Sequence, residues 1–166
     1  MFKKNVGVKT VFTALFICSS YSIGSSSTWT EEQEKVWSSV EYYVGLIENG
    51  QVDEFLEYYH SDFSGWVPQM GYLPDDKTSR SKFVRHYLEP NEEGKTESGE
   101  VLLGIKKPIS INLFGDVAIV HYIQEEIRTT NGEDRIREVW AWTDILKQVG
   151  GKWVMIGDHG QILDSK

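Results

Sequence analysis

Cysteine is almost absent from this chain, and the one cysteine, Cys18, lies in the N-terminal segment. A disulfide framework is therefore excluded, so packing has to supply the stability of the fold. The sequence also lacks an HExxH motif and any other short histidine spacing typical of a metal centre. We therefore predict no metal site and no cofactor.

Basic residues are scarcer than acidic ones, 17 against 25, which gives a formal net charge of −8. Such a surface repels phosphate backbones, and no basic stripe with interleaved aromatic residues is present. We therefore expect no nucleic-acid partner. The apolar run at residues 10–18 is too short to span a bilayer, so we expect no stable membrane insertion.

The N-terminal segment has the pattern of a secretory signal peptide. Three lysines and the apolar run at residues 10–18 are followed by small residues. This order predicts a signal peptide over residues 1–24, a spacer over 25–29 and one soluble domain over 30–166, secreted or periplasmic. Two alternatives stay open: a buried N-terminal strand, and a lipoprotein anchored through Cys18, which matches part of a lipoprotein box.

Helical periodicity occupies the first half of the presumed domain. Apolar residues recur at helical spacing over residues 30–48, after a capping box formed by Thr30 and Gln33. A short second helix follows, and we predict that Asp53 opens it. A short strand at residues 63–67 and a third helix at 79–88 complete this half.

From residue 100 onward the pattern changes to β-structure. Strands are predicted over residues 101–105, 109–113, 117–130, 135–149 and 152–163. The dipeptides Asn131-Gly132 and Gly150-Gly151 are tight-turn signals that join the last three strands into an antiparallel meander. Three helices followed by a curved sheet predict an α+β fold, in which the helices close one face of the sheet and leave a cone-shaped pocket.

Four short motifs stand at corresponding places in a known superfamily. They are Tyr59-His60-Ser61-Asp62-Phe63, Thr143-Asp144-Ile145-Leu146, Gly151-Lys152-Trp153 and His159-Gly160-Gln161. With the order of elements, they resemble the nuclear transport factor 2-like superfamily, in particular its SnoaL-like branch and the association domain of calcium/calmodulin-dependent kinase II. The resemblance implies a cystatin-like α+β roll, in which three N-terminal helices pack on a curved, mostly antiparallel sheet, and it implies a homodimer. Its members include ketosteroid isomerases, polyketide cyclases and non-catalytic binding or oligomerising domains.

Two departures from the superfamily affect the chemistry that the resemblance implies. In ketosteroid isomerases the base is an aspartate that precedes a proline shortly after the second helix, and the matching residue here is Val67, before Pro68. A valine cannot carry a proton. The kinase association domain has a pocket arginine where this chain has Asp144, and its closing His-x-Ser becomes His159-x-Gln161. The resemblance therefore implies an altered preference for ligand charge.

Strand pairing in the meander predicts one decorated sheet face and one aliphatic face. If Gly150-Gly151 forms a two-residue turn, Trp142 lies opposite His159, and Asp144 shares their face. A two- or four-residue loop between the preceding strands adds His121 to this face, whereas a three-residue loop sends it to the other side. Histidines, a carboxylate and indoles together suit acid–base work on an apolar ligand. Aromatic rows on a sheet also form cores or dimer interfaces.

Three more aromatic residues are candidates for ligand binding. We expect Trp66 and Tyr72 near the mouth of the cone, because they lie between the second and third helices. They either hold the flat face of a ligand or pack under the loop. Tyr43 points inward from the first helix, as core or as a hydroxyl donor. The sequence does not decide which sheet face the helices cover.

The sequence therefore predicts an exported SnoaL-like domain that binds a small, partly apolar ligand. One alternative is an enzyme of the SnoaL or ketosteroid isomerase type, which acts on a carbonyl compound with His159 or Asp144 as the base. The other is a dimerising scaffold whose cavity is filled by side chains.

Overall fold

The computed structural model describes residues 29–67, 75–90, 100–105, 108–130 and 134–166. The predicted signal peptide at residues 1–24 and the candidate Tyr72 lie outside the described residues. Within the described ranges, no helix is both long and apolar enough to cross a membrane.

The helices are α1 (Glu31–Glu48), α2 (Val52–Leu56) and α3 (Lys77–Leu88). The predicted capping box of α1 is confirmed, because the Thr30 and Gln33 side chains bond each other's backbone N–H groups. The prediction that Asp53 opens α2 is wrong. The N-cap is Gln51, and the Asp53 carboxylate instead pairs with Arg85 of α3.

The strands form one mixed seven-stranded sheet. They are β1 (Tyr59–Trp66), β2 (Asp75–Asp76), β3 (Glu100–Ile105), β4 (Ser110–Phe114), β5 (Val117–Thr130), β6 (Asp134–Val149) and β7 (Lys152–Ser165). The order is β2-β1-β7-β6-β5-β3, with β4 also paired to β5. The meander of β5, β6 and β7 is confirmed. β1 begins four residues earlier than predicted, and its pairing with β7 is parallel.

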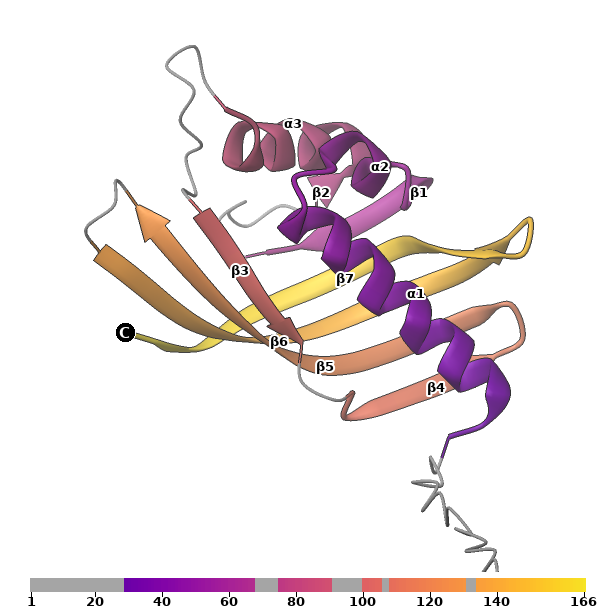
Figure 1. Cartoon of the computed structure of the whole chain (residues 1–166). Helices are drawn as coiled ribbons and strands as arrows, with labels where there is room; N and C mark the ends of the chain where they lie inside the picture. Colours follow the sequence, from indigo (N-terminus) through magenta and orange to yellow (C-terminus); the bar gives the residue numbers. More distant parts are fainter. Residues whose placement is uncertain (1–28, 68–74, 91–99, 106–107, 131–133) are drawn as a thin grey trace, which may run out of the picture.

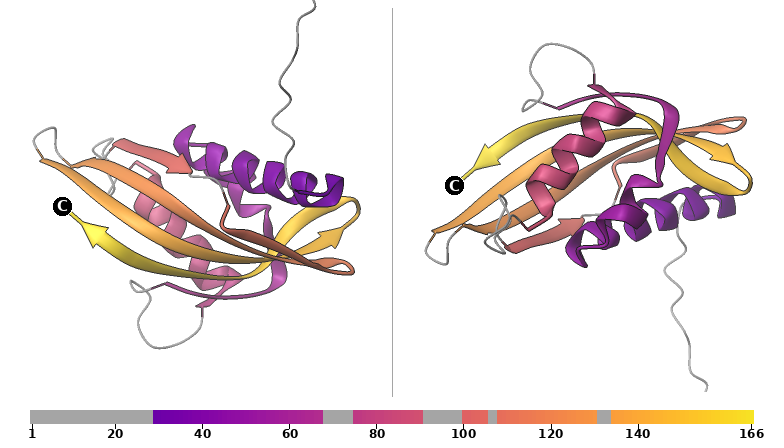
Figure 2. Two further views of the ribbon diagram at one scale, coloured as in Figure 1. Left: turned by 90° about the horizontal axis from the view of Figure 1, so that it is seen from below. Right: turned by 90° about the horizontal axis from the view of Figure 1, so that it is seen from above.

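The sheet is strongly curved, and the helices lie on its concave side (Figures 1 and 2). α1 crosses above the meander, whereas α3 lies beside β1 at the other end (Figure 1). The apolar stripe of α1 packs on β5 and β6, where Val36, Val40, Val120 and Leu146 are fully buried. We call the concave side the inner face of the sheet and the opposite side the outer face.

A β-bulge in β7 overturns the predicted pairing of Trp142 with His159. Leu146 pairs with Met155, but the next residue, Ile145, pairs with Gly157, so Ile156 is an extra residue in β7. Because side chains alternate between faces, one extra residue exchanges the faces of all the residues beyond it. His159 therefore pairs with Thr143 on the outer face.

The length of the connection between β5 and β6 places His121 on the opposite sheet face from Trp142. Thr130 pairs with Asp134, so three residues separate the paired positions. His121 consequently pairs with Thr143 on the outer face, and Tyr122 pairs with Trp142 on the inner face. The helices therefore cover the face of Trp142 and Asp144, and the aliphatic face of the meander is the outer one.

Candidate ligand-binding cavity

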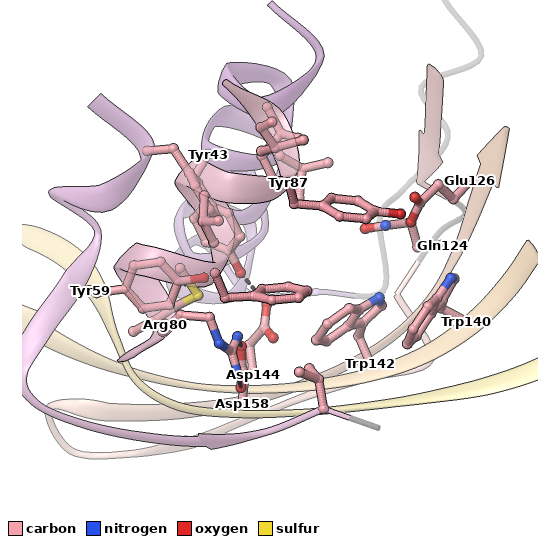
Figure 3. Close-up of a pocket in the computed structure, with 18 of the residues that line it drawn as sticks. Tyr43, Tyr59, Arg80, Tyr87, Gln124, Glu126, Trp140, Trp142, Asp144 and Asp158 are labelled. Carbon is pink, nitrogen blue, oxygen red and sulfur yellow. Dashed lines mark hydrogen bonds and ion pairs between the residues drawn. The ribbon is translucent and has the colours of Figure 1, made fainter. Parts of the chain in front are cut away.

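A cavity of about 140 Å³ lies between the helices and the inner face of the meander (Figure 3). Most of its lining is aromatic or aliphatic. The lining residues are Tyr43, Val44, Ile47, Phe55, Tyr59, Val67, Arg80, Phe83, Val84, Tyr87, Leu88, Tyr122, Gln124, Glu126, Trp140, Trp142, Asp144, Met155 and Asp158. An apolar cavity with a few converging polar groups is the usual form of a small-molecule site.

A buried carboxyl group, that of Asp144, stands at one end of the cavity. Asp144 is 1% exposed, and its Oδ2 accepts hydrogen bonds from the hydroxyl groups of Tyr43 and Tyr122, the latter at 3.0 Å. Tyr43 reaches this point from the buried stripe of α1, and Tyr122 comes from the neighbouring strand β5. Both tyrosines donate to the same oxygen, and Oδ1 has no hydrogen-bond donor among the described residues.

Burial raises the pKa of Asp144 to about 7, although the two tyrosine hydroxyls act in the opposite direction. Burial also raises the pKa of Tyr43 and of Tyr122 well above the usual range, with the charge of Asp144 acting in the same direction. The tyrosines therefore remain donors. Near neutral pH the Asp144 carboxyl is present in both protonation states, so it can accept or release a proton.

Beside Asp144 lies a buried ion-pair network centred on Arg80 of α3. Arg80 is 3% exposed and binds Asp158 through two hydrogen bonds of 2.5 and 3.0 Å, and it also pairs with Asp75. Burial raises the pKa of Asp158, whereas the Arg80 charge lowers it. Gly65 of β1 makes this network possible, because a Cβ atom there would lie 2.1 Å from Asp158 Oδ1.

Two stacked indoles continue the inner face of β6 away from Asp144. The rings of Trp140 and Trp142 are 5.5 Å apart with an interplanar angle of 20°. Trp142 lies over Gly160, where a Cβ atom would come within 2.7 Å of the ring. The Nε1 of Trp140 donates to Glu138 Oε2 at 3.2 Å.

A charged cluster borders the cavity beyond the indoles. Arg128 lies 2.8 Å from Glu138 and 3.1 Å from Glu126, and it also donates to the hydroxyl of Tyr87. Burial raises the pKa of Glu126, while the charge of Arg128 lowers it. The cluster is thus internally paired, and the two ends of the cavity differ in character.

The structure brings three of the sequence-predicted site residues together. Tyr43, Trp142 and Asp144 all line the cavity. The predicted pairs His121–Asp144 and His159–Asp144 do not form, because both histidines are on the outer face.

The remaining described candidates lie on that outer face. His121 Nδ1 is 2.9 Å from Thr143 Oγ1, and His159 is exposed. Trp66, which is 42% exposed, pairs with His159 in the β1–β7 ladder and does not line the cavity. For His159 the cause is the bulge at Ile156, which turns Asp158 inward instead. Trp66 faces outward because side chains alternate along β1, where Phe63 and Gly65 are the buried residues.

Comparisons with known proteins agree on the fold. No family model and no curated protein matches the sequence. Among solved structures, a Novosphingobium aromaticivorans protein provisionally named a scytalone dehydratase superimposes with a TM-score of 0.68 at 11% identity, over 81% of this chain and 86% of that one. An NTF2-like protein with a cystatin-like fold from the same species gives 0.62 at 15%, covering 81% and 83%. The association domain of C. elegans CaMKII gives 0.62 at 14%, covering 78% and 95%.

The chain has the nuclear transport factor 2-like fold. The resemblance seen in the sequence is thereby confirmed at the level of the fold. In this nuclear transport factor 2-like cone, Val67 lines the cavity and is 4% exposed. The position that carries the base in ketosteroid isomerases is thus apolar here, and the carboxyl groups that reach the cavity come from β5, β6 and β7.

Proposed function

We propose that the cavity binds a small, largely apolar ligand whose hydroxyl or carbonyl oxygen hydrogen-bonds to Asp144. The observation that carries this proposal is a buried carboxyl group that lines an otherwise mostly apolar cavity. A carboxyl with a pKa of about 7 accepts a hydrogen bond when ionised and donates one when protonated. It therefore suits either a hydroxyl or a carbonyl group.

The open cavity argues against the scaffold alternative, in which side chains fill the cone. The described side chains leave about 140 Å³ between helices and sheet. A void of this size in a core reduces stability, because its lining loses packing contacts. A ligand restores those contacts, which supports binding as the use of the cavity.

The test is calorimetric titration with 4-butylphenol, a small apolar probe with one hydroxyl group. We expect saturable binding, and we expect Asp144→Asn to weaken it about tenfold, because an amide accepts a hydrogen bond less strongly than a carboxylate. Asp116→Asn, an exposed change in the β4–β5 turn, is the control and should leave the affinity unchanged. Absence of binding, or equal affinity of the wild type and Asp144→Asn, would contradict the proposal.

Acid–base catalysis on a carbonyl compound is the second candidate, favoured by the pKa of about 7 at Asp144. The structural similarity to a protein provisionally named a dehydratase is in keeping with it. In the proposed step, ionised Asp144 takes a proton from the carbon next to the carbonyl. The C–H electron pair becomes the enolate double bond, and the carbonyl electron pair moves onto oxygen.

This step has a direct assay in the exchange of hydrogen for deuterium next to the carbonyl of cyclohexanone in D₂O, followed by proton NMR. Catalysis requires exchange above the buffer rate that is lost in Asp144→Asn. If the wild type exchanges deuterium into cyclohexanone no faster than buffer alone, the catalytic candidate is refuted and only the binding function stands.

The outer face supports a homodimer as the assembled form. Ile119, Ile123 and Ile145 lie on it half-buried, and Phe114 at its border is 62% exposed. An exposed sheet face that carries several apolar side chains commonly forms an interface. Light scattering after size exclusion should give twice the chain mass, and Ile145→Lys should give the monomer mass. A monomeric wild type refutes this part.

We further propose that the protein is exported after cleavage near Gly24. The support is the order of lysines, apolar run and small residues at the N-terminus. Mass spectrometry of the secreted or periplasmic protein should find a mature start near residue 25, whereas an uncleaved or lipid-modified N-terminus would contradict cleavage there.

A further inference from the structure

Two hydrogen-bonding side chains on the cavity wall, those of Trp142 and Gln124, make no hydrogen bond with the part of the chain that the structure describes. Trp142 Nε1 is buried and has no hydrogen-bond acceptor among the described residues. Gln124 is only 7% exposed, lines the cavity, and makes no hydrogen bond with the described part of the chain. Buried polar groups are nearly always paired, so the unpaired indole N–H of Trp142 requires an explanation.

Strand register places the Gln124 side chain next to that of Trp142. Trp142 pairs directly with Tyr122, and Gln124, two residues along β5, pairs with Trp140. Gln124 and Trp142 are thus diagonal neighbours on one face, within reach of a shared group. In Figure 3 the indole nitrogen of Trp142 lies at the edge of the ring that is turned away from Asp144.

The neighbouring indole shows that an unpaired N–H is not general on this wall. Trp140 and Trp142 have the same side chain, the same strand and the same inner face, and their rings are stacked. Trp140 Nε1 has an acceptor in Glu138, whereas Trp142 Nε1 has none. Of the two indoles on this wall, only that of Trp142 therefore lacks an acceptor among the described residues.

We propose that Trp142 Nε1 and the Gln124 amide form a second hydrogen-bonding subsite, which takes an oxygen acceptor of the bound ligand. This inference rests on the proposed binding function of the cavity. Trp142 and Asp144 are two residues apart on β6, so the subsites are separated by about 7 Å. The ligand class is a compound with an apolar body, a hydroxyl group at one end and a carbonyl oxygen roughly that distance away.

The charges on the wall indicate that this acceptor is neutral. Three carboxyl groups line the cavity, those of Glu126, Asp144 and Asp158, against the single guanidinium of Arg80. Arg80 is already bound by Asp75 and Asp158. A carboxylate ligand would face uncompensated negative charge, whereas a ketone oxygen accepts from neutral N–H donors without this repulsion.

The test compares two matched probes by calorimetry, using protein purified after expression of the full chain. The probes are 4-butylphenol and 4-(4-hydroxyphenyl)butan-2-one, which share the phenol and the chain length and differ in the ketone. Without a subsite the ketone binds more weakly, because it is less apolar. We expect instead that the wild type binds the ketone about tenfold more tightly, since the ketone satisfies buried donors.

Paired variants assign this preference to its residues. Trp142→Phe removes the orphan N–H and retains an aromatic ring, and it should abolish the preference for the ketone. Trp140→Phe is the matched control and should retain the preference, because its N–H already has an acceptor in Glu138. Gln124→Leu, close in size, should reduce it. The indole ¹H–¹⁵N signal missing in Trp142→Phe should move downfield with the ketone and not with 4-butylphenol.

The outcomes separate this inference from the proposed function. If 4-butylphenol binds but the ketone gains nothing and leaves the indole signal in place, the second subsite is refuted and the binding function stands. If neither probe binds the wild type, both are refuted. If Trp140→Phe loses the preference as fully as Trp142→Phe, the effect is general packing and the subsite is refuted.

Discussion

The protonation of Asp144 should be visible in the pH dependence of stability. Its pKa is about 7 in the folded chain, against 3.8 for the unperturbed group. Between these two values the folded state binds more protons than the unfolded state, so the free energy of unfolding falls as the pH rises. Ionisation of this buried carboxyl therefore destabilises the fold, even though two tyrosines donate to it.

The magnitude follows from the same two values. At pH 5, which is two units below the pKa of the folded state, the carboxyl is protonated in the folded chain and ionised in the unfolded chain. At pH 8 both are ionised. Each pH unit contributes 1.36 kcal/mol, so the carboxyl lowers the free energy of unfolding by about 3 kcal/mol from pH 5 to pH 8.

The assay is urea unfolding followed by tryptophan fluorescence at pH 5, 6, 7 and 8, on the wild type and on Asp144→Asn. Asparagine has nearly the same shape and accepts from Tyr43 and Tyr122, but it does not titrate. Because every other group is common to both proteins, the difference between them isolates Asp144. The stability of the wild type should fall relative to the variant by about 3 kcal/mol. Parallel curves across this range would refute the assignment of a raised pKa.

Two glycines give further predictions. Gly65→Ala places a methyl group against Asp158 and Arg80, and disruption of this buried ion pair should cost about 3–5 kcal/mol in urea unfolding; a loss below about 1 kcal/mol would show that the network shifts freely. Gly160→Ala pushes the Trp142 ring toward the cavity, so calorimetry should show about tenfold weaker binding of 4-butylphenol. In urea unfolding, the variant should lose about 1–3 kcal/mol of its free energy of unfolding. Unchanged affinity would place the ligand elsewhere.

The parts of the fold that local patterns determine were predictable. The capping box at Thr30 and the Gly150-Gly151 turn are encoded by neighbouring residues, and they gave correct elements. The Asn131-Gly132 turn signal lies outside the described residues. β1 was only partly predicted, because the predicted strand begins at residue 63 whereas β1 begins at Tyr59. The two-residue β2 was missed, because its pairing with β1 is a long-range contact.

The site was predictable only as far as side chains alternate regularly between the two faces of each strand. Tyr43, Trp142 and Asp144 were identified from helical spacing and alternation, and they line the cavity. Arg80 was not identified as a site residue, because its partner Asp158 is 78 positions away. The bulge residue has no distinctive sequence signal, so no pattern identified Asp158 rather than its neighbour as the inward residue.

The bulge at Ile156 has a consequence for how such a cavity changes its chemistry. Asp158 and His159 are adjacent, and the single extra residue before them decides which of the two contributes to the cavity. A β7 that paired regularly here, with the bulge straightened and every residue kept, would exchange a carboxylate for an imidazole on the wall and would bring His159 in place of Gly160 under Trp142, without any substitution. The outer row of β7 is thus a second set of cavity residues, and the bulge rather than the composition of the strand selects between the two sets.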